Sequence, residues 1–355
     1  MIKIDGSHGE GGGQIVRTAL ALSTALQKPF EVDNIRMGRK DSGLKAQHLT
    51  CLKALEQLCN AKYSGVSVGS SSLRYIPGEL KARKVEVDIG TAGSITLLLQ
   101  SLLVPCFLAG HPITLKIKGG TSGKWQMPFD YFENVFAPHL GKYADIKTKL
   151  DKRGYYPKGG GSVEIRINPL YNLGNRGSAP KISLVEQGTL AQIKGISHAS
   201  KMLQKANVAE RQADSAKSML LDLGVNVDIR AEYCDTLSPG SGITLWAVFS
   251  RNMEPTELDP SVVGSDIIGE KGKPAEEVGS EAAKMLIREI QSKAPVDEHL
   301  ADNLIPFLAM FGGSIKVSNI SSHTRTNIYA AEQFLGKIFE IDENRNIISC
   351  KGSKL

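Results

Sequence analysis

Apolar and polar positions follow one another along this chain in an order that recurs. A strand pattern at residues 2–4 leads into a glycine-rich turn, and a helical pattern over residues 15–26 follows, with apolar positions three and four apart. The same order returns with a strand at 85–87 and a helix over 95–108. A third, fainter copy consists of residues 300–310, 314–317, 327–335 and 338–341. Such repetition predicts several similar α+β units packed side by side.

The middle of the chain breaks this order. After a loop-like stretch, the pattern predicts a compact set of four strands and one helix, of a size that suits a small inserted domain. These elements are expected at 182–186, 190–196, 208–223, 225–229 and 243–249. A long helix over 275–292 has one apolar face and is interpreted as the return to the first domain. We therefore predict a large domain of residues 1–181 and 276–355, with a small inserted domain of residues 182–275.

Length and composition agree with this organisation. The chain has 355 residues, about twice the ~150 typical of one domain. Hydrophobic residues make up 41% and charged residues 23%, which excludes a disordered chain or a coiled coil. The longest mostly apolar run, residues 95–109, is shorter than the ~20 residues that a membrane span needs, so no membrane association is expected.

Cysteine usage and net charge bear on location and partners. The five cysteines are scattered and form no CxxC pair, and the N-terminus has no apolar signal core. We therefore expect a reduced cytoplasmic protein with buried thiols. The formal net charge of +6 permits a polyanionic partner without requiring one. The sequence shows no coiled-coil seam, so it does not indicate an oligomeric state.

The glycine-rich turn at Gly9–Gly13 is the first candidate site. Consecutive glycines before a helix let backbone N–H groups approach an anion, and Gln14 and Arg17 share a helix face at that end. Glu10 could hold a divalent cation next to phosphates. The alternative is a tight strand–helix turn with a solvated Arg17, and the loop composition alone leaves both open.

A basic segment follows, which contains almost no acid. Such a cluster can contact phosphates through arginine forks, although most charged runs are solvated helix faces. The segment comprises Arg36, Arg39, Lys40, Lys45 and His48, with Gln47 inside it.

Two further stretches resemble nucleotide-handling motifs only superficially. Gly119–Trp125 is close to a phosphate-binding Walker loop, but it is one residue short, and Trp125 cannot ligate Mg²⁺. Lys3 begins a Lys-x-Asp-Gly stretch like that of lysine-adenylating ligases, which would make it a nucleophile. A lysine on an edge strand that ends in an Asp-Gly turn is the favoured interpretation.

His323 is the histidine whose position suggests chemistry. It is expected just after a strand and just before a helix, where a neutral imidazole could attack phosphorus and carry it as a phosphoramidate. Its local sequence alone fits a polar loop histidine that caps a helix at least as well. No HExxH or paired metal spacing is present.

These motifs together resemble the RNA 3′-terminal phosphate cyclase family, and the resemblance covers nearly the whole chain. The matching stretches are, in order, Gly9–Arg17, Arg36–Arg39, Gly43–Leu49, Gly90–Ser94 with Gln100, Gly119–Thr121, Gly154–Gly161, Leu300–Leu304 and Ser322–Asn327. The resemblance implies an α/β (α+β) fold. Its large domain would contain repeated βαβ-type units, each like the C-terminal domain of a translation initiation factor. A small α/β domain of thioredoxin-like topology would be inserted.

The resemblance also implies a reaction. ATP would adenylylate an enzyme histidine, AMP would pass to an RNA 3′-phosphate end, and the neighbouring 2′-OH would close a 2′,3′-cyclic phosphate. Several alternatives remain: a non-catalytic relative that acts in RNA processing or ribosome assembly, a ligase that uses Lys3, and a module that only binds through its basic face.

Site roles follow from the resemblance, position by position. His323 is similar to the covalent nucleophile, Arg17, Arg36, Arg39 and Gln47 to the phosphate-binding set, and Glu10 to a contact for Mg²⁺ or Mn²⁺. The expected ATP-binding positions also include Gln14, Gln100, Pro128, Asp130, Tyr131, His299 and Asp302. Pro128 and His299 would sandwich the adenine. Bacterial relatives tend to have Tyr where this chain has His299, and imidazole offers a smaller stacking area.

Overall fold

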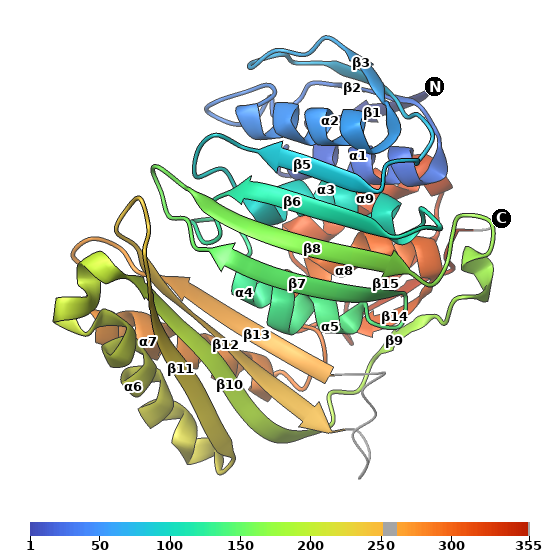
Figure 1. Cartoon of the computed structure of the whole chain (residues 1–355). Helices are drawn as coiled ribbons and strands as arrows, with labels where there is room; N and C mark the ends of the chain where they lie inside the picture. The colour runs from blue at the N-terminus through green and yellow to red at the C-terminus, as the bar shows by residue number, and fades with distance from the viewer. Residues whose placement is uncertain (251–260, 354–355) are drawn as a thin grey trace.

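The computed structural model describes residues 1–250 and 261–353 as a mixed α/β protein. Within these residues it has four four-stranded sheets, and three of them share one topology (Figure 1). In each of the three, the first two strands run parallel, and the fourth lies antiparallel between the second and the third. This confirms the predicted α/β class and the repetition of α+β units.

The first two units are continuous in sequence. The first comprises β1 (Ile2–Asp5), α1 (Gln14–Leu26), β2 (Phe30–Asp33), α2 (Ala46–Cys59), β3 (Lys62–Ser64) and β4 (Leu73–Ile76). The second comprises β5 (Lys84–Asp88), α3 (Ile95–Phe107), β6 (Ile113–Gly119), α4 (Phe129–Tyr131), a π-helical segment (Phe132–Phe136), α5 (Ala137–His139), β7 (Ala144–Lys152) and β8 (Gly161–Pro169). Their strands alternate buried and exposed residues, as expected for sheets with one face in water.

The third unit is interrupted after its first strand. It comprises β9 (Ile182–Leu184), α8 (Glu298–Phe311), β14 (Gly313–Lys316), α9 (Ser322–Leu335), β15 (Phe339–Asp342) and β16 (Ile347–Cys350). A 3₁₀ turn at Arg176–Ser178 precedes β9. The sequence pattern assigned residues 182–186 to the insert, but β9 pairs with β14, with Ile182 opposite Gly313. The pairing partner lies more than a hundred residues away, so no local pattern could indicate it.

The inserted body has its own sheet and hydrophobic cluster. It comprises β10 (Thr189–Ser200), a 3₁₀ helix (Lys201–Ala206), α6 (Val208–Leu220), a 3₁₀ turn (Leu221–Leu223), β11 (Asn226–Cys234), β12 (Ser241–Ser250), β13 (Ser261–Ile268) and α7 (Ala275–Gln291). The sequence pattern did not predict β13.

Helix α7 packs differently from the prediction. Its apolar residues Val278, Ala282 and Leu286 belong to the cluster of the insert, and the helix contacts α6, β12 and β13. It was predicted as the return to the large domain, because an apolar face does not reveal which partner it covers. The division into two domains stays a prediction, and the packing favours an insert from β10 through α7.

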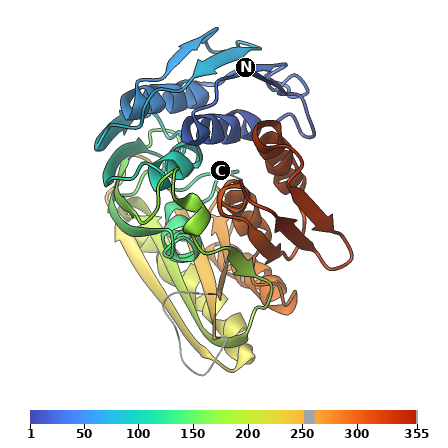
Figure 2. The same ribbon diagram turned by 90° about the vertical axis from the view of Figure 1, so that its right-hand side faces the viewer.

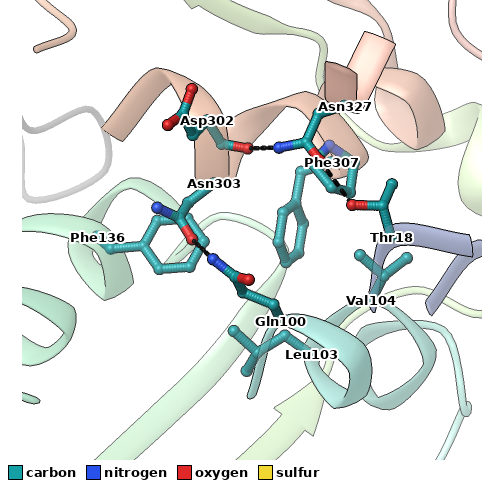
Figure 3. Close-up of a pocket in the computed structure, with 10 residues that line it drawn as sticks. Thr18, Gln100, Leu103, Val104, Phe136, Asp302, Asn303, Phe307 and Asn327 are labelled. Carbon is teal, nitrogen blue, oxygen red and sulfur yellow. Dashed lines mark hydrogen bonds between the residues drawn. The ribbon is translucent and has the colours of Figure 1, made fainter. Parts of the chain in front are cut away.

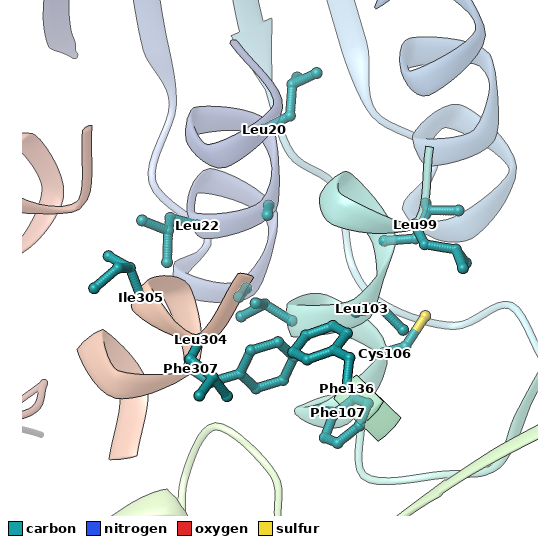
Figure 4. Packing of buried hydrophobic residues seen from close by; sticks show 14 of the residues in the cluster. Leu20, Leu22, Leu99, Leu103, Cys106, Phe107, Phe136, Leu304, Ile305 and Phe307 are labelled. Carbon is teal, nitrogen blue, oxygen red and sulfur yellow. The ribbon is translucent and has the colours of Figure 1, made fainter. Parts of the chain in front are cut away.

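The helices of the three units meet in the middle of the large body (Figure 2). Helix α3 is apolar on all sides, as suits a helix surrounded by protein. Its Leu103 and Phe107 lie near Leu304 and Phe307 of α8 (Figure 4), and the rings of Phe107 and Phe307 meet edge to face with centroids 5.1 Å apart. This core fixes α1, α3 and α8 relative to one another, and the candidate site is built on their polar ends.

The cysteines and the apolar helices bear on two expectations from composition, buried thiols and no membrane association. All five cysteines are free thiols, and four of them are buried. Among the described helices, none has both the length and the apolar character that crossing a membrane would demand.

Candidate active site

The glycine-rich turn joins β1 to the first turn of α1. Gly9 and Gly11 have φ of 60° and 55°, a left-handed conformation that favours glycine. Gly13 occupies the N-cap of α1 and provides no side-chain cap to the first helical N–H groups. These donors, together with the helix dipole, form an end that favours an anion.

The carboxylate of Glu10 joins this turn to two distant segments. Arg39 Nη2 donates to Glu10 Oε2 at 2.9 Å, and Arg39 Nε donates to the Glu10 carbonyl at 3.0 Å. The Ser322 hydroxyl donates to Glu10 Oε1, and His323 Nδ1 lies 3.4 Å from Glu10 Oε2. The structure therefore brings together the predicted metal contact, one predicted phosphate-binding arginine and the predicted nucleophile.

His323 lies in the first turn of α9, not before the helix as the sequence pattern indicated. Ser321 is the N-cap, and its Oγ accepts from the Thr324 N–H at 2.9 Å. Gln14 Nε2 donates to the His323 carbonyl at 2.7 Å and so joins α1 to α9. With Nδ1 toward the Glu10 carboxylate, the ring proton belongs on Nδ1, and Nε2 keeps its lone pair. The imidazole side chain is 50% exposed, so that lone pair can reach a substrate.

Asp302 holds the start of α9 from α8. Its Oδ1 accepts from Ser321 Oγ at 2.8 Å and from Thr324 Oγ1 at 2.6 Å. Its carbonyl accepts from Asn327 Nδ2 at 2.6 Å, and Asn327 Oδ1 accepts from Thr18 Oγ1 at 2.6 Å. Burial raises the pKa of Asp302. In this geometry the carboxylate positions the helix turn that carries His323.

A pocket opens between α1, α3, α8 and α9, beside these bonds (Figure 3). Its polar wall is held together by hydrogen bonds, such as that from Gln100 Nε2 to Asn303 Oδ1 at 3.0 Å. Its apolar wall comes from the core, and its accessible space of about 20 Å³ is enough for about one water molecule. The lining residues are Thr18, Gln100, Leu103, Val104, Phe136, Asp302, Asn303, Pro306, Phe307 and Asn327.

Arg17 carries a positive charge beside the start of α1. Its Nε donates to Gln100 Oε1 at 2.8 Å, and an added Cβ on Gly13 would lie 3.2 Å from its Nη1. Desolvation lowers the pKa of Arg17 to about 10, which leaves it charged at neutral pH. In the described part of the chain, no carboxylate pairs with it. A cation held here without a counterion is suited to an anionic ligand.

The basic segment joins the same region. Arg36 donates to the Asp41 carbonyl from Nη2 at 3.2 Å, and desolvation, with Arg39 nearby, lowers its pKa. Gln47 Nε2 donates to the Ser94 carbonyl at 2.8 Å and so links α2 to the loop that precedes α3. We call Arg17, Arg36 and Arg39 the cationic cluster.

His48 is a residue whose role the sequence did not indicate. It was counted in the basic segment, but it is buried, and desolvation together with Arg17 lowers its pKa to about 3. Its Nδ1 accepts from the Lys45 N–H at 2.9 Å. A Cβ on Gly13 would lie 2.3 Å from its Nε2, so the neutral ring packs directly against the glycine-rich turn. Its local sequence carries no signal of this role, because the contact joins two segments that lie far apart in the chain.

Three predicted ATP-binding residues are buried among protein partners. Asp130 receives two hydrogen bonds from Arg153, at 2.6 and 2.8 Å, and Tyr131 donates to Asp297 Oδ1 at 2.6 Å. Pro128 is buried at the start of α4. This arrangement leaves their assigned contacts with adenosine as predictions, and it gives the carboxylate of Asp130 a structural partner.

His299 and Lys3 occupy exposed positions. His299 lies in the first turn of α8, one turn before Asp302, and the charges of Asp297 and Asp266 raise its pKa. Lys3 lies on the solvent side of β1, while its neighbour Ile4 is buried. That placement disfavours Lys3 as a nucleophile.

The surroundings of Glu10 limit how it could contact a metal ion. Within the described ranges, no group of three or more His, Cys, Asp or Glu side chains could hold a metal ion. A single carboxylate fits Mg²⁺ only where substrate phosphates and water supply the other ligands, which is the common arrangement for nucleotide sites. The Glu10 side chain is 31% exposed beside the cationic cluster and so fits that arrangement.

Comparisons with known proteins cover almost the entire chain. The model of a family described as RNA 3′-terminal phosphate cyclase matches residues 8–341. A protein of Pyrococcus furiosus named RNA 3′-terminal phosphate cyclase is 46% identical over 342 residues, which are 96% of this chain and 95% of that protein. Proteins with the same name are 44% identical in Methanosarcina acetivorans, over 98% of both chains, and 40% identical in Archaeoglobus fulgidus, over 98% of this chain and 100% of that protein.

Proposed function

The chain belongs to the RNA 3′-terminal phosphate cyclase family, and from this premise we propose that it converts an RNA 3′-terminal phosphate into a 2′,3′-cyclic phosphodiester with ATP. One observation supports this most directly: His323 and Glu10 meet beside the cationic cluster at the start of α1. A nucleophile, an orienting carboxylate and a group of cations are what transfer of a nucleotidyl group requires.

In the first step, His323 Nε2 attacks the α-phosphorus of ATP. The N–P bond forms as the bond to the β-phosphate oxygen breaks, and pyrophosphate leaves toward the cationic cluster. Arg17 and Arg36 stabilise the charge on the departing oxygens, because few carboxylates near them compete. Glu10 holds the proton on Nδ1 and stabilises the positive charge that develops on the imidazole.

In the second step, an oxygen of the RNA 3′-phosphate attacks the AMP phosphorus and releases His323. The RNA then ends in a phosphoanhydride whose leaving group is AMP. In the third step, the adjacent 2′-oxygen attacks the 3′-phosphorus and AMP departs, which closes the ring. The last step is intramolecular and gains the effective molarity of two neighbouring groups.

Two of the predicted ATP-binding residues, Gln100 and Asp302, line the pocket of Figure 3, and Asp302 bonds the turn of α9 that carries His323. Mg²⁺ or Mn²⁺ at Glu10 would neutralise phosphate charge when bound. We infer that RNA 3′ ends are the substrate class.

The first test separates this function from its alternatives. The protein is incubated with ATP labelled at the α-phosphate, and the labelled protein is treated with acid and with base. We expect label that survives base and is lost in acid, as a phosphoramidate is. His323→Ala should abolish labelling, while Lys3→Ala, the matched control for the lysine alternative, should label normally.

Two outcomes would contradict the proposal. Labelling of His323→Ala together with loss of labelling in Lys3→Ala would assign the nucleophile to the lysine. A native protein that never labels would favour the role of a non-catalytic factor in RNA processing or ribosome assembly. As a further check, an RNA with a 3′-phosphate on a terminal 2′-deoxy sugar should be adenylylated without being cyclised.

A further inference from the structure

The loop after β6 has a feature that the proposed reaction does not use. Trp125 is 94% exposed, the largest value among the big apolar side chains of the described ranges. Its φ is 58°, in the left-handed region that bulky residues rarely adopt. A strained backbone that presents an indole ring to water indicates a surface that something else covers.

Two neighbouring loops present apolar side chains at the same edge of the molecule. The β7–β8 loop carries Tyr156, which is 79% exposed, and the β11–β12 loop carries Leu237, which is 58% exposed. These two loops touch, because the Lys158 N–H donates to Ser238 Oγ at 3.1 Å and a Cβ on Gly160 would lie 2.5 Å from Leu237. They stand side by side at the left of Figure 1.

The loop of Trp125 is tied both to the β7–β8 loop and to the candidate active site. The Thr121 N–H donates to the Gly154 carbonyl at 3.0 Å. Gly120 pairs with Ser94 in an isolated parallel bridge, and the Ser94 carbonyl accepts from Gln47. The loop that carries Trp125 therefore begins, at the end of β6, beside a segment that Gln47 of the proposed phosphate-binding set contacts.

Each of the two aromatic side chains has a lysine close to it in the sequence. Lys124 is half-exposed and pairs with Glu270 across 2.9 Å, and Lys158 is exposed. Lysine is depleted in protein–protein interfaces. Aromatic rings interleaved with lysines are typical of surfaces that stack the bases and contact the phosphates of single-stranded nucleic acid.

We propose that Trp125, Tyr156 and Leu237, with Lys124 and Lys158, form a stacking surface for the single-stranded RNA that precedes the terminal nucleotide. Bases stack on the two aromatic rings, and the backbone phosphates lie near the lysines. The inference rests on the proposed function, because it needs an RNA end in the active site. It adds that nucleotides upstream of the reacting end also bind the protein.

The test compares a long and a short substrate. One is a single-stranded RNA of about ten nucleotides with a 3′-phosphate, and the other is a 3′-phosphorylated dinucleotide. Trp125→Ala should raise KM for the long RNA about tenfold, as the loss of one stacked base does. It should leave kcat, activity on the dinucleotide and labelling by ATP unchanged. Leu170→Ala is the control, since Leu170 is 56% exposed just past the opposite end of β8.

A second variant tests the phosphate contact. Lys158→Gln should reduce the dependence of log KM on log salt concentration by about 0.7 for the long RNA, as loss of one phosphate contact on a single strand does. Tyr156→Ala should act in the same direction as Trp125→Ala. Activity on the dinucleotide should be unchanged in both.

The outcomes distinguish this inference from the proposed function. If the native protein cyclises both RNAs and Trp125→Ala leaves KM for the long RNA unchanged, the stacking surface is wrong while the function stands. If Trp125→Ala instead disrupts an oligomer, the surface belongs to a second copy of the chain. If the native protein cyclises neither RNA, the proposed function fails, and the stacking surface fails with it.

Discussion

Two regions of the molecule place buried or half-buried arginines in opposite surroundings. In the cationic cluster, Arg17 has an amide partner and no carboxylate among the described residues, and desolvation lowers its pKa. Between the second unit and the insert, Arg153 is 2% exposed and bonds the Asp130 carboxylate with both Nη atoms. Glu232 pairs with it as well, at 2.6 Å, and these carboxylates raise its pKa against the effect of burial.

This difference distinguishes an arginine that can bind a ligand from one that stabilises the fold. A buried arginine whose hydrogen bonds are completed inside the protein holds two bodies together and has no capacity for a ligand. A half-buried arginine with an incomplete set of partners keeps that capacity and lowers stability until an anion arrives. The identity of the partner thus decides the role of each arginine.

The largest expected effect is on stability and follows from the paired region. Arg153→Met leaves the Asp130 carboxylate buried without its cation, which should lower the free energy of unfolding by about 3–5 kcal/mol. Denaturant unfolding measures this. The control is Arg166→Met, which breaks an exposed pair with Glu164 and should cost less than about 1 kcal/mol. Equal losses in the two variants would remove the distinction between the regions.

The next effect is on activity and follows from the cationic cluster. Arg17→Met should slow labelling by ATP about 10²–10³-fold, the usual loss when one preorganised group that stabilises transition-state charge is removed. Its stability should be unchanged or higher, because a desolvated charge without a carboxylate is removed. Arg74→Met, on the exposed face of β4, is the control for loss of charge alone. A large loss of stability in Arg17→Met would mean that this arginine is structural.

The sequence predicted the repeated fold because its information is local. A glycine turn followed by an apolar helix at 3.6-residue spacing recurs in the first two units, and each can be recognised without its neighbours. The start of the third unit could not be recognised, since β9 is three residues long and its partner β14 follows only after the whole insert. The sequence also did not indicate that α7 packs with the insert, because that packing depends on tertiary contacts.

The candidate site shows a similar division. Glu10, Arg39 and His323 were all singled out by residue type and motif, and the structure brings them together. Asp130 was grouped with the nucleotide contacts through the family resemblance, which did not reveal that its carboxylate pairs with Arg153. The neutral state of His48 was equally hidden, because burial and two nearby arginines, rather than its own sequence context, lower its pKa.

Counted per pH unit, the smallest effect that we expect is a pH dependence that both regions share. Desolvation lowers the pKa of His48 and of His198 to about 3, the first helped by Arg17 and the second by Arg153. The unfolded chain binds a proton at each histidine below about pH 6.5, while the folded protein does not. Between about pH 6.5 and 3 the free energy of unfolding therefore rises with pH, by about 1.4 kcal/mol per pH unit for each histidine, and is lost as the pH falls. Above about pH 6.5 these two histidines contribute no further slope.

Variants of the two histidines test this pH dependence in each region separately. His48→Asn and His198→Asn should each reduce the slope of unfolding free energy between about pH 4 and 6 by about 1.4 kcal/mol per pH unit. Pyrophosphate should then separate them, because an anion at the cationic cluster offsets the repulsion that Arg17 and Arg36 exert on a proton at His48. With saturating pyrophosphate, the slopes of the native protein and of His48→Asn should become more alike. The slopes of the native protein and of His198→Asn should stay as different as before, because Arg153 beside His198 is already paired with Asp130. If pyrophosphate changes both differences equally, the anion does not bind close to His48. The proposal that the cationic cluster binds pyrophosphate would then be wrong.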